Sequence, residues 1–91
     1  MSYSASFKTT GSKQVDLLLV TLHAKSFARM DYWESLGHSK ESLEETKQEL
    51  VVKGLLSKNG AIKSDIKTYY YNHRGQESER VQYLQHKVGT V

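Results

Sequence analysis

One segment of this chain is apolar around most of a helix, and the rest of the fold must pack against it. Val15, Leu18 and Leu22 recur at helical spacing, and Leu17 and Phe27 widen the apolar face. A face this wide belongs to a helix that is surrounded by its own domain or shared between the domain and a partner chain. The 91 residues are enough for one domain with a modest core around that helix.

Composition argues against several classes of protein. The chain has no Cys, which excludes disulfide frameworks, thiol nucleophiles and Cys-bearing zinc sites. Its four His are too scattered for a metal-ligand spacing, and no phosphate loop or hydrolase motif is present. We therefore expect no enzyme activity, no catalytic residue, no metal and no cofactor. No apolar run approaches the roughly 18 residues that a membrane span needs, and no signal peptide is evident, so we expect a cytoplasmic protein.

Charge is unevenly distributed along the chain. Residues 1–30 carry four basic residues and one acidic residue, residues 31–52 carry two basic and six acidic, and residues 53–75 carry five basic and one acidic. This segregation suggests that one region meets a polyanion while another does not. The alternative, a solvated surface that is uneven by chance, stays open.

The order of the helices follows from their start and stop signals. Residues 1–12 are small, polar and unpatterned, which predicts a loose arm, and a first helix begins at Lys13. Asp31 and Glu34 form a capping-box pattern, which predicts a short helix over residues 32–36. Ser39 is a good N-cap for a third helix that ends near Gly54. A last helix is predicted over residues 76–88.

Between the third and last helices the pattern favours a β-hairpin. Asn59 and Gly60 form the strongest short hairpin signal, flanked by strands over residues 55–58 and 61–72. The three tyrosines at 69–71 suit a strand. There they either pack against the core and form surface, or stack on exposed bases as aromatic residues among lysines do.

This order of elements resembles a winged helix-turn-helix domain. Residues 33–42 (WESLGHSKES) match the junction between its two helices, residues 52–56 (VKGLL) the exit into the wing, and residues 67–71 (KTYYY) the return strand. The resemblance covers residues 13–72, and the trailing helix is similar to the dimerisation helix of small regulators of the PadR and MarR kind. It implies a mostly helical α+β fold: a loose arm over 1–12, a winged domain over 13–75 with three helices and a β-hairpin wing, and a dimerisation helix over 76–91.

The function that this resemblance implies is sequence-specific binding of double-stranded DNA by a homodimer. Such a chain would act as a small transcriptional repressor or as a plasmid, phage or chromosome-partition factor, associated with the nucleoid. The third helix would enter the major groove and the hairpin would lie on the backbone or in the minor groove. The recognition-helix candidates are Ser39, Lys40, Ser42, Thr46 and Lys47. The wing candidates are Lys58, Asn59, Lys63 and Lys67, and the dimer-interface candidates are Val81, Tyr83, Leu84 and Val88.

The acidity of the third helix supports a different function. Between residues 39 and 53 it carries four Glu against three Lys, and carboxylates near phosphate are repelled. The alternative is a winged-helix module for protein–protein interaction, in which the acidic face meets a basic partner. Sensing of a small ligand is a third interpretation.

Overall fold

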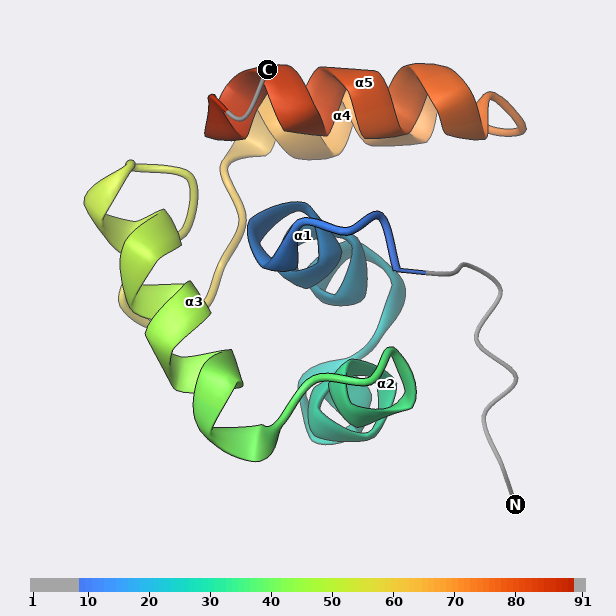
Figure 1. Cartoon of the computed structure of the whole chain (residues 1–91). Helices are drawn as coiled ribbons and strands as arrows, with labels where there is room; N and C mark the ends of the chain where they lie inside the picture. The colour runs from blue at the N-terminus through green and yellow to red at the C-terminus, as the bar shows by residue number, and fades with distance from the viewer. Residues whose placement is uncertain (1–8, 90–91) are drawn as a thin grey trace.

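The computed structural model describes residues 9–89, which form five α-helices and a short 3-10 helix. These are α1 (Lys13–His23), η1 (Ser26–Ala28), α2 (Arg29–Ser35), α3 (Lys40–Val52), α4 (Ser64–Asn72) and α5 (Glu77–Val88). Helix α1 lies at the centre, with α3 and α2 on two sides and the α4–α5 pair along a third (Figure 1). None of the helices in this part of the chain has the length and apolar composition that crossing a membrane requires.

The apolar helix predicted from Lys13 is the centre of the core. Val15, Leu18 and Val20 on α1 have no exposed surface, and α1 contacts α2, α3 and α5. The neighbouring helices contribute Trp33 from α2, Leu50 from α3, and Leu84 and Val88 from α5. Of the two alternatives for this helix, the structure has the first, a helix surrounded by its own domain. Helix α1 ends at His23, and Phe27 stands outside the core, 80% exposed.

A buried carboxylate ties three parts of the chain together. Asp16 has no exposed surface, and it accepts hydrogen bonds from the hydroxyl of Thr9 and from both the backbone N–H and the hydroxyl of Thr10, the latter two at 2.8 Å. On its other side, Oδ2 of Asp16 lies 2.7 Å from Nε2 of His38, in the turn between α2 and α3. Because a buried carboxylate is costly unless hydrogen bonds satisfy it, the positions of these three segments depend on one another.

Most of the loose arm predicted over residues 1–12 lies outside the described residues. The part that the structure describes, residues 9–12, leads directly into α1. Thr9 and Thr10 bind Asp16, and the hydroxyl of Ser12 accepts from the backbone N–H of Val15, which caps α1.

The turn predicted between the second and third helices is present. Gly37 has a φ of +95°, in the left-handed region that glycine tolerates, and the Ser39 hydroxyl accepts from the N–H of Ser42 as the N-cap of α3. Trp33 is fully buried beneath the turn, and its indole N–H donates to the Ser39 carbonyl and to the Ser42 hydroxyl. The second helix, however, begins at Arg29 rather than near residue 32, so Asp31 lies within its first turn and caps nothing.

The prediction of a β-hairpin wing is wrong. A tight turn does form at residues 57–60, with Gly60 at a φ of +87° and one antiparallel bridge between Leu56 and Ile62. No strand continues from it within residues 9–89, because residues 64–72 form helix α4. The buried residues of this segment are Ile66 and Tyr70, which are spaced i,i+4 as on a helix and not by two as on a strand. The described chain is therefore all-helical and not the predicted α+β fold.

Helix α5 confirms the helix predicted over residues 76–88, and it closes the core from above. The buried Arg80 joins it to α4, since Nε of Arg80 donates to the carbonyl of Tyr70 at 2.9 Å. The guanidinium also lies 3.7 Å from the centroid of the Tyr70 ring, a favourable cation–π geometry. Leu84 and Val88 then pack inward toward α1.

Removal of the Asp16 carboxylate is expected to destabilise the whole domain. Asp16→Ala leaves the Thr10 N–H and the groups of Thr9 and His38 without their acceptor, and we expect the free energy of unfolding to fall by about 3 kcal/mol. Urea denaturation followed by circular dichroism measures this loss. Asp31→Ala, at an exposed position, is the control and should change stability by no more than about 0.5 kcal/mol. Equal effects of the two substitutions would show that the Asp16 network does not support the fold.

Candidate functional site

A positively charged recess lies where the end of α1, the start of α2 and helix α4 meet. We call it the basic cleft. It has a volume of about 390 Å³ and is lined by Thr21, Leu22, His23, Ala24, Lys25, Arg29, Ala61, Ile62, Lys67 and Tyr71. The lining includes two lysines, an arginine and a histidine, and it includes no carboxylate. Cations from two segments that are distant in sequence, residues 23–29 and helix α4, thus line one space, as a binding site for an anion requires.

Arg29 is the most firmly positioned of these cations. Its Nε donates to the carbonyl of Ala24 at 3.2 Å, which folds the side chain back toward the end of α1. Gly60 lies next to this side chain: a Cβ built there would stand 3.6 Å from a terminal nitrogen of Arg29, an ordinary contact distance, and glycine suits the position because its φ is +87°. Arg29 lines both the basic cleft and a second cavity, and the bond to Ala24 uses one of the five N–H donors of its guanidinium.

Within residues 9–89, the lysines of this region form no ion pair with a carboxylate. Lys25, Lys58, Lys63 and Lys67 are all exposed. The ion pairs found within residues 9–89 are His38 with Asp16, Arg80 with Glu77, and Lys87 with Asp65, and none of them involves these four lysines. Their charge is therefore available to an external anion.

His23 lines the basic cleft and contacts the core residue Tyr70. Nε2 of His23 is hydrogen-bonded to the hydroxyl of Tyr70, and the two rings meet edge to face with centroids 5.3 Å apart. Partial burial of the imidazole lowers the pKa of His23 below its ordinary value; the nearby Glu77 opposes this shift and Arg80 adds to it. At neutral pH the cleft therefore takes its positive charge from Lys25, Arg29 and Lys67.

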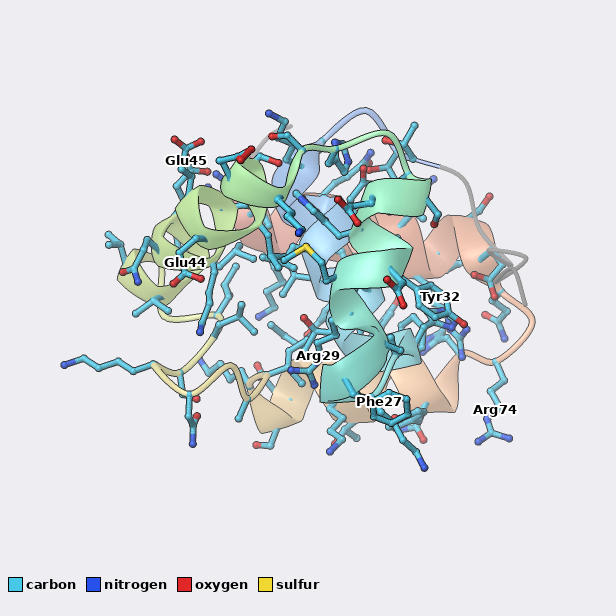
Figure 2. The ribbon with its side chains drawn as sticks, turned by 90° about the horizontal axis from the view of Figure 1, so that it is seen from below. Phe27, Arg29, Tyr32, Glu44, Glu45 and Arg74 are labelled. Atoms are coloured by element: carbon cyan, nitrogen blue, oxygen red, sulfur yellow. The ribbon has the colours of Figure 1, made fainter. Side chains whose placement is uncertain are left out.

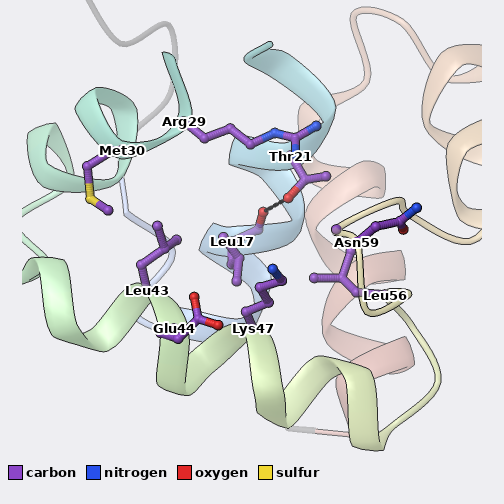
Figure 3. A pocket seen from close by; sticks show the side chains of 10 residues that line it. Leu17, Thr21, Arg29, Met30, Leu43, Glu44, Lys47, Leu56 and Asn59 are labelled. Carbon is purple, nitrogen blue, oxygen red and sulfur yellow. Dashed lines mark hydrogen bonds between the residues drawn. The ribbon is translucent and has the colours of Figure 1, made fainter. Parts of the chain in front are cut away.

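A second cavity, of about 330 Å³, adjoins the basic cleft on the far side of Arg29. Figure 3 shows Leu17, Met30, Leu43 and Leu56 around it, with the hydroxyl of Thr21 donating to the carbonyl of Leu17 at 2.8 Å. Lys47 and Glu44 reach its edge from α3. This apolar cavity carries charges of both signs at its rim, so its electrostatics do not select an anion as those of the basic cleft do.

The outward side of α3 is acidic. Glu41, Glu44, Glu45 and Glu49 are exposed, together with Gln48, and we call this surface the acidic ridge. Figure 2 shows Glu44 and Glu45 on α3 and Phe27 and Arg29 at the start of α2, with Glu44 and Arg29 both in the lining of the second cavity. The molecule therefore presents a negative surface and a positive one on different elements.

Two of the predicted recognition-helix residues do not face outward. Ser42 and Thr46 are 3% and 2% exposed, and with Leu50 they form the buried line of α3. Leu43 is only half-buried, because α3 is rotated so that Ser42, to which the Trp33 indole donates, faces the core. Ser39 and Lys40 are exposed at the tip of α3, and Lys47 is half-buried at the apolar cavity.

The four predicted wing residues do not lie on a wing. Lys58 and Asn59 are exposed on the tight turn, Lys63 precedes α4, and Lys67 lies on α4 in the lining of the basic cleft. Lys67 is the one candidate among the cleft residues, and the cations Lys25 and Arg29 and the exposed ring of Tyr71 were not candidates. The basic character of residues 1–30 pointed toward the first two, but only the fold shows that they approach Lys67.

Of the predicted dimer-interface residues, two are buried and two are half-buried. Leu84 and Val88 are buried inside the single chain, so they are not available to a second copy. Val81 and Tyr83 are half-buried, and the ring of Tyr83 stacks on Tyr69 with centroids 3.8 Å apart. Their apolar pattern reflects the core of the domain.

Comparison of the chain with protein-family models, with curated proteins and with solved structures returns no match. The site is therefore interpreted from its own geometry.

The lowered pKa of His23 makes a specific contribution to the pH dependence of stability. The unfolded chain binds a proton at His23 more tightly than the folded chain does. The contribution of His23 to the free energy of unfolding is therefore complete above its ordinary pKa of 6.5, and it is lost as the pH falls from 6.5 toward the lowered pKa. We expect His23→Gln to lose less stability than the parent chain between about pH 7.5 and about pH 5. Urea denaturation at both pH values tests this. Parallel losses in the two proteins would contradict it.

Proposed function

We propose that the chain is a nucleic-acid-binding protein with DNA as its polymer, and that the phosphate backbone lies in the basic cleft. The observation that carries the proposal is the convergence of Lys25, Arg29 and Lys67 on a recess without a carboxylate. Lysines and arginines bind phosphates by charge and by hydrogen bonds, and release of counterions from the polymer drives the association. Arg29 suits this role because the Ala24 carbonyl already orders its guanidinium. A cytoplasmic, nucleoid-associated location accompanies the proposal.

The proposed contact differs from insertion of α3 into a major groove. The acidic ridge lies on the side of α3 that a groove would enclose, and its carboxylates would face phosphates on both strands. Only the tip of α3, at Ser39 and Lys40, can approach DNA without that repulsion. Affinity would then come mainly from backbone contacts, which position the polymer without reading its sequence.

Removal of one cleft lysine is expected to weaken binding and to reduce its salt dependence. For Lys67→Gln we expect the slope of log K against log salt to become less negative by about 0.9 for duplex DNA, since one phosphate contact is lost. Fluorescence anisotropy with a labelled random duplex at several salt concentrations measures the slope. Lys13→Gln is the matched control, because Lys13 is exposed at the opposite end of α1 and should leave the slope unchanged. A protein that does not bind at low salt, or equal slopes for both variants, would refute the proposal.

The acidic ridge favours a second candidate function, capture of a basic protein segment. Its four exposed carboxylates form no ion pair within residues 9–89. They offer the charge complement of a Lys- and Arg-rich peptide.

Charge reversal on the ridge distinguishes the two functions. If the ridge lies near bound DNA, Glu44→Lys with Glu45→Lys should strengthen duplex binding. If it holds a basic segment, the same double variant should lose binding of a synthetic Lys- and Arg-rich peptide while its DNA affinity stays the same. Anisotropy titrations with the two probes give both results, and a double variant that changes neither would exclude the ridge from both functions.

The homodimer remains part of the proposal for DNA. Two copies bound to one polymer would increase affinity through effective concentration. Since Leu84 and Val88 are internal, only surface residues of α5 such as Val81 are available for such contact. Sedimentation velocity of the free protein tests for the homodimer, and a protein that is monomeric at all concentrations would contradict it.

A further inference from the structure

We propose that the basic cleft takes a single strand, one of whose bases stacks on the ring of Tyr71. This inference rests on the proposed function and specifies the form of the polymer. Tyr71 lines the cleft from α4 and is 44% exposed. Lys67 lies four residues earlier on the same helix, so the ammonium and the ring are neighbours on one face of α4. A phosphate bound by Lys67 would thus bring its own base close to Tyr71.

Tyr71 is the member of the tyrosine run that is free for stacking. The rings of His73 and Tyr83 both stack on Tyr69, each with a centroid separation of 3.8 Å. Tyr70 is buried against His23 and Arg80. Tyr71 instead touches the Tyr70 ring edge to face, at 5.9 Å and 76°, a contact that leaves much of its own surface uncovered.

An exposed aromatic ring among unpaired cations fits an unstacked base better than a duplex. In a duplex the faces of the bases are covered by their neighbours, so a ring on the protein surface finds only sugar and phosphate. A single strand offers open base faces beside its phosphates, and proteins bind it by stacking along a basic groove. A volume of about 390 Å³ is within the range that encloses a small ligand, which is enough for part of one nucleotide.

A second exposed ring extends the same arrangement beyond the cleft. Phe27 is 80% exposed and lies two residues from both Lys25 and Arg29. Figure 2 shows it beside Arg29 at the start of α2. Exposure of so much of a phenylalanine side chain to water is unfavourable, and a neighbouring base along the strand would cover the ring.

The test compares a 12-nucleotide oligo-dT, a 12-nucleotide oligo-rU and a 12-base-pair duplex by fluorescence anisotropy. For Tyr71→Leu we expect affinity for the single strands to fall by about 5- to 100-fold, the effect of losing one stacked base. Affinity for the duplex should change less than about twofold, since its contacts are with phosphates. Tyr71→Phe keeps the ring and should bind like the parent chain. Val52→Ser removes an apolar side chain that is 86% exposed on α3, outside the cleft, and serves as the matched control.

Each outcome separates this inference from the proposed function. If Tyr71→Leu leaves single-strand binding unchanged while Lys67→Gln still makes the salt slope less negative, the inference of a stacked base is wrong and the proposal of backbone binding stands. An equal loss for duplex and single strands would also overturn stacking. Failure of the parent chain to bind any of the three probes would overturn both. A specific loss on oligo-dT or on oligo-rU supports the inference, and the polymer with the larger loss identifies DNA or RNA as the source of the strand.

Discussion

The arrangement of this small domain depends on a buried carboxylate that hydrogen bonds must satisfy. Asp16 belongs to the central helix, yet its partners are the segment before that helix and His38 in the turn between α2 and α3. The His38 ring packs against Trp33, with centroids 4.2 Å apart, and the Trp33 indole in turn binds Ser39 and Ser42. One requirement for satisfied polar groups therefore extends from α1 through α2 to the rotation of α3. That rotation turns Ser42 and Thr46 inward and leaves the glutamates outside.

The opposite end of α1 is held by aromatic and cationic contacts. His23 meets Tyr70, which lies under the guanidinium of Arg80, so the last turn of α1, helix α4 and helix α5 form one packed unit. This unit places Lys67 and Tyr71 opposite Lys25 and Arg29 across the basic cleft. The cleft is thus a consequence of how α4 docks, because a strand in its place would alternate its side chains and direct Ile66 and Tyr70 differently.

Sequence reasoning succeeded where the signals are local and failed where they depend on tertiary contacts. The N-cap at Ser39 and the apolar face of α1 are each set by residues within a few positions of one another, and both were predicted. The Asn59–Gly60 turn was also predicted, but the segment after it was assigned by the strand propensity of its tyrosines. Packing of Ile66 and Tyr70 outweighs that propensity, which is weak and depends on context. Lys67 was recognised as a candidate from its charge. Its proximity to Arg29 and Tyr71 depends on how α4 packs, so the spacing of the residues in the sequence could not predict it.

The net charge of +3 conceals two surfaces of opposite sign, and their separation matters more than the total. A polyanion approaching the chain is attracted by the lysines around the basic cleft and repelled by the acidic ridge on α3. These two forces orient the molecule before contact, with the start of α2 and helix α4 toward the polymer and α3 away from it. In a helix-turn-helix protein that reads a major groove the orientation is the reverse. The distribution of charge thus separates the surface that we propose for backbone binding from the helix that would read bases in a helix-turn-helix protein.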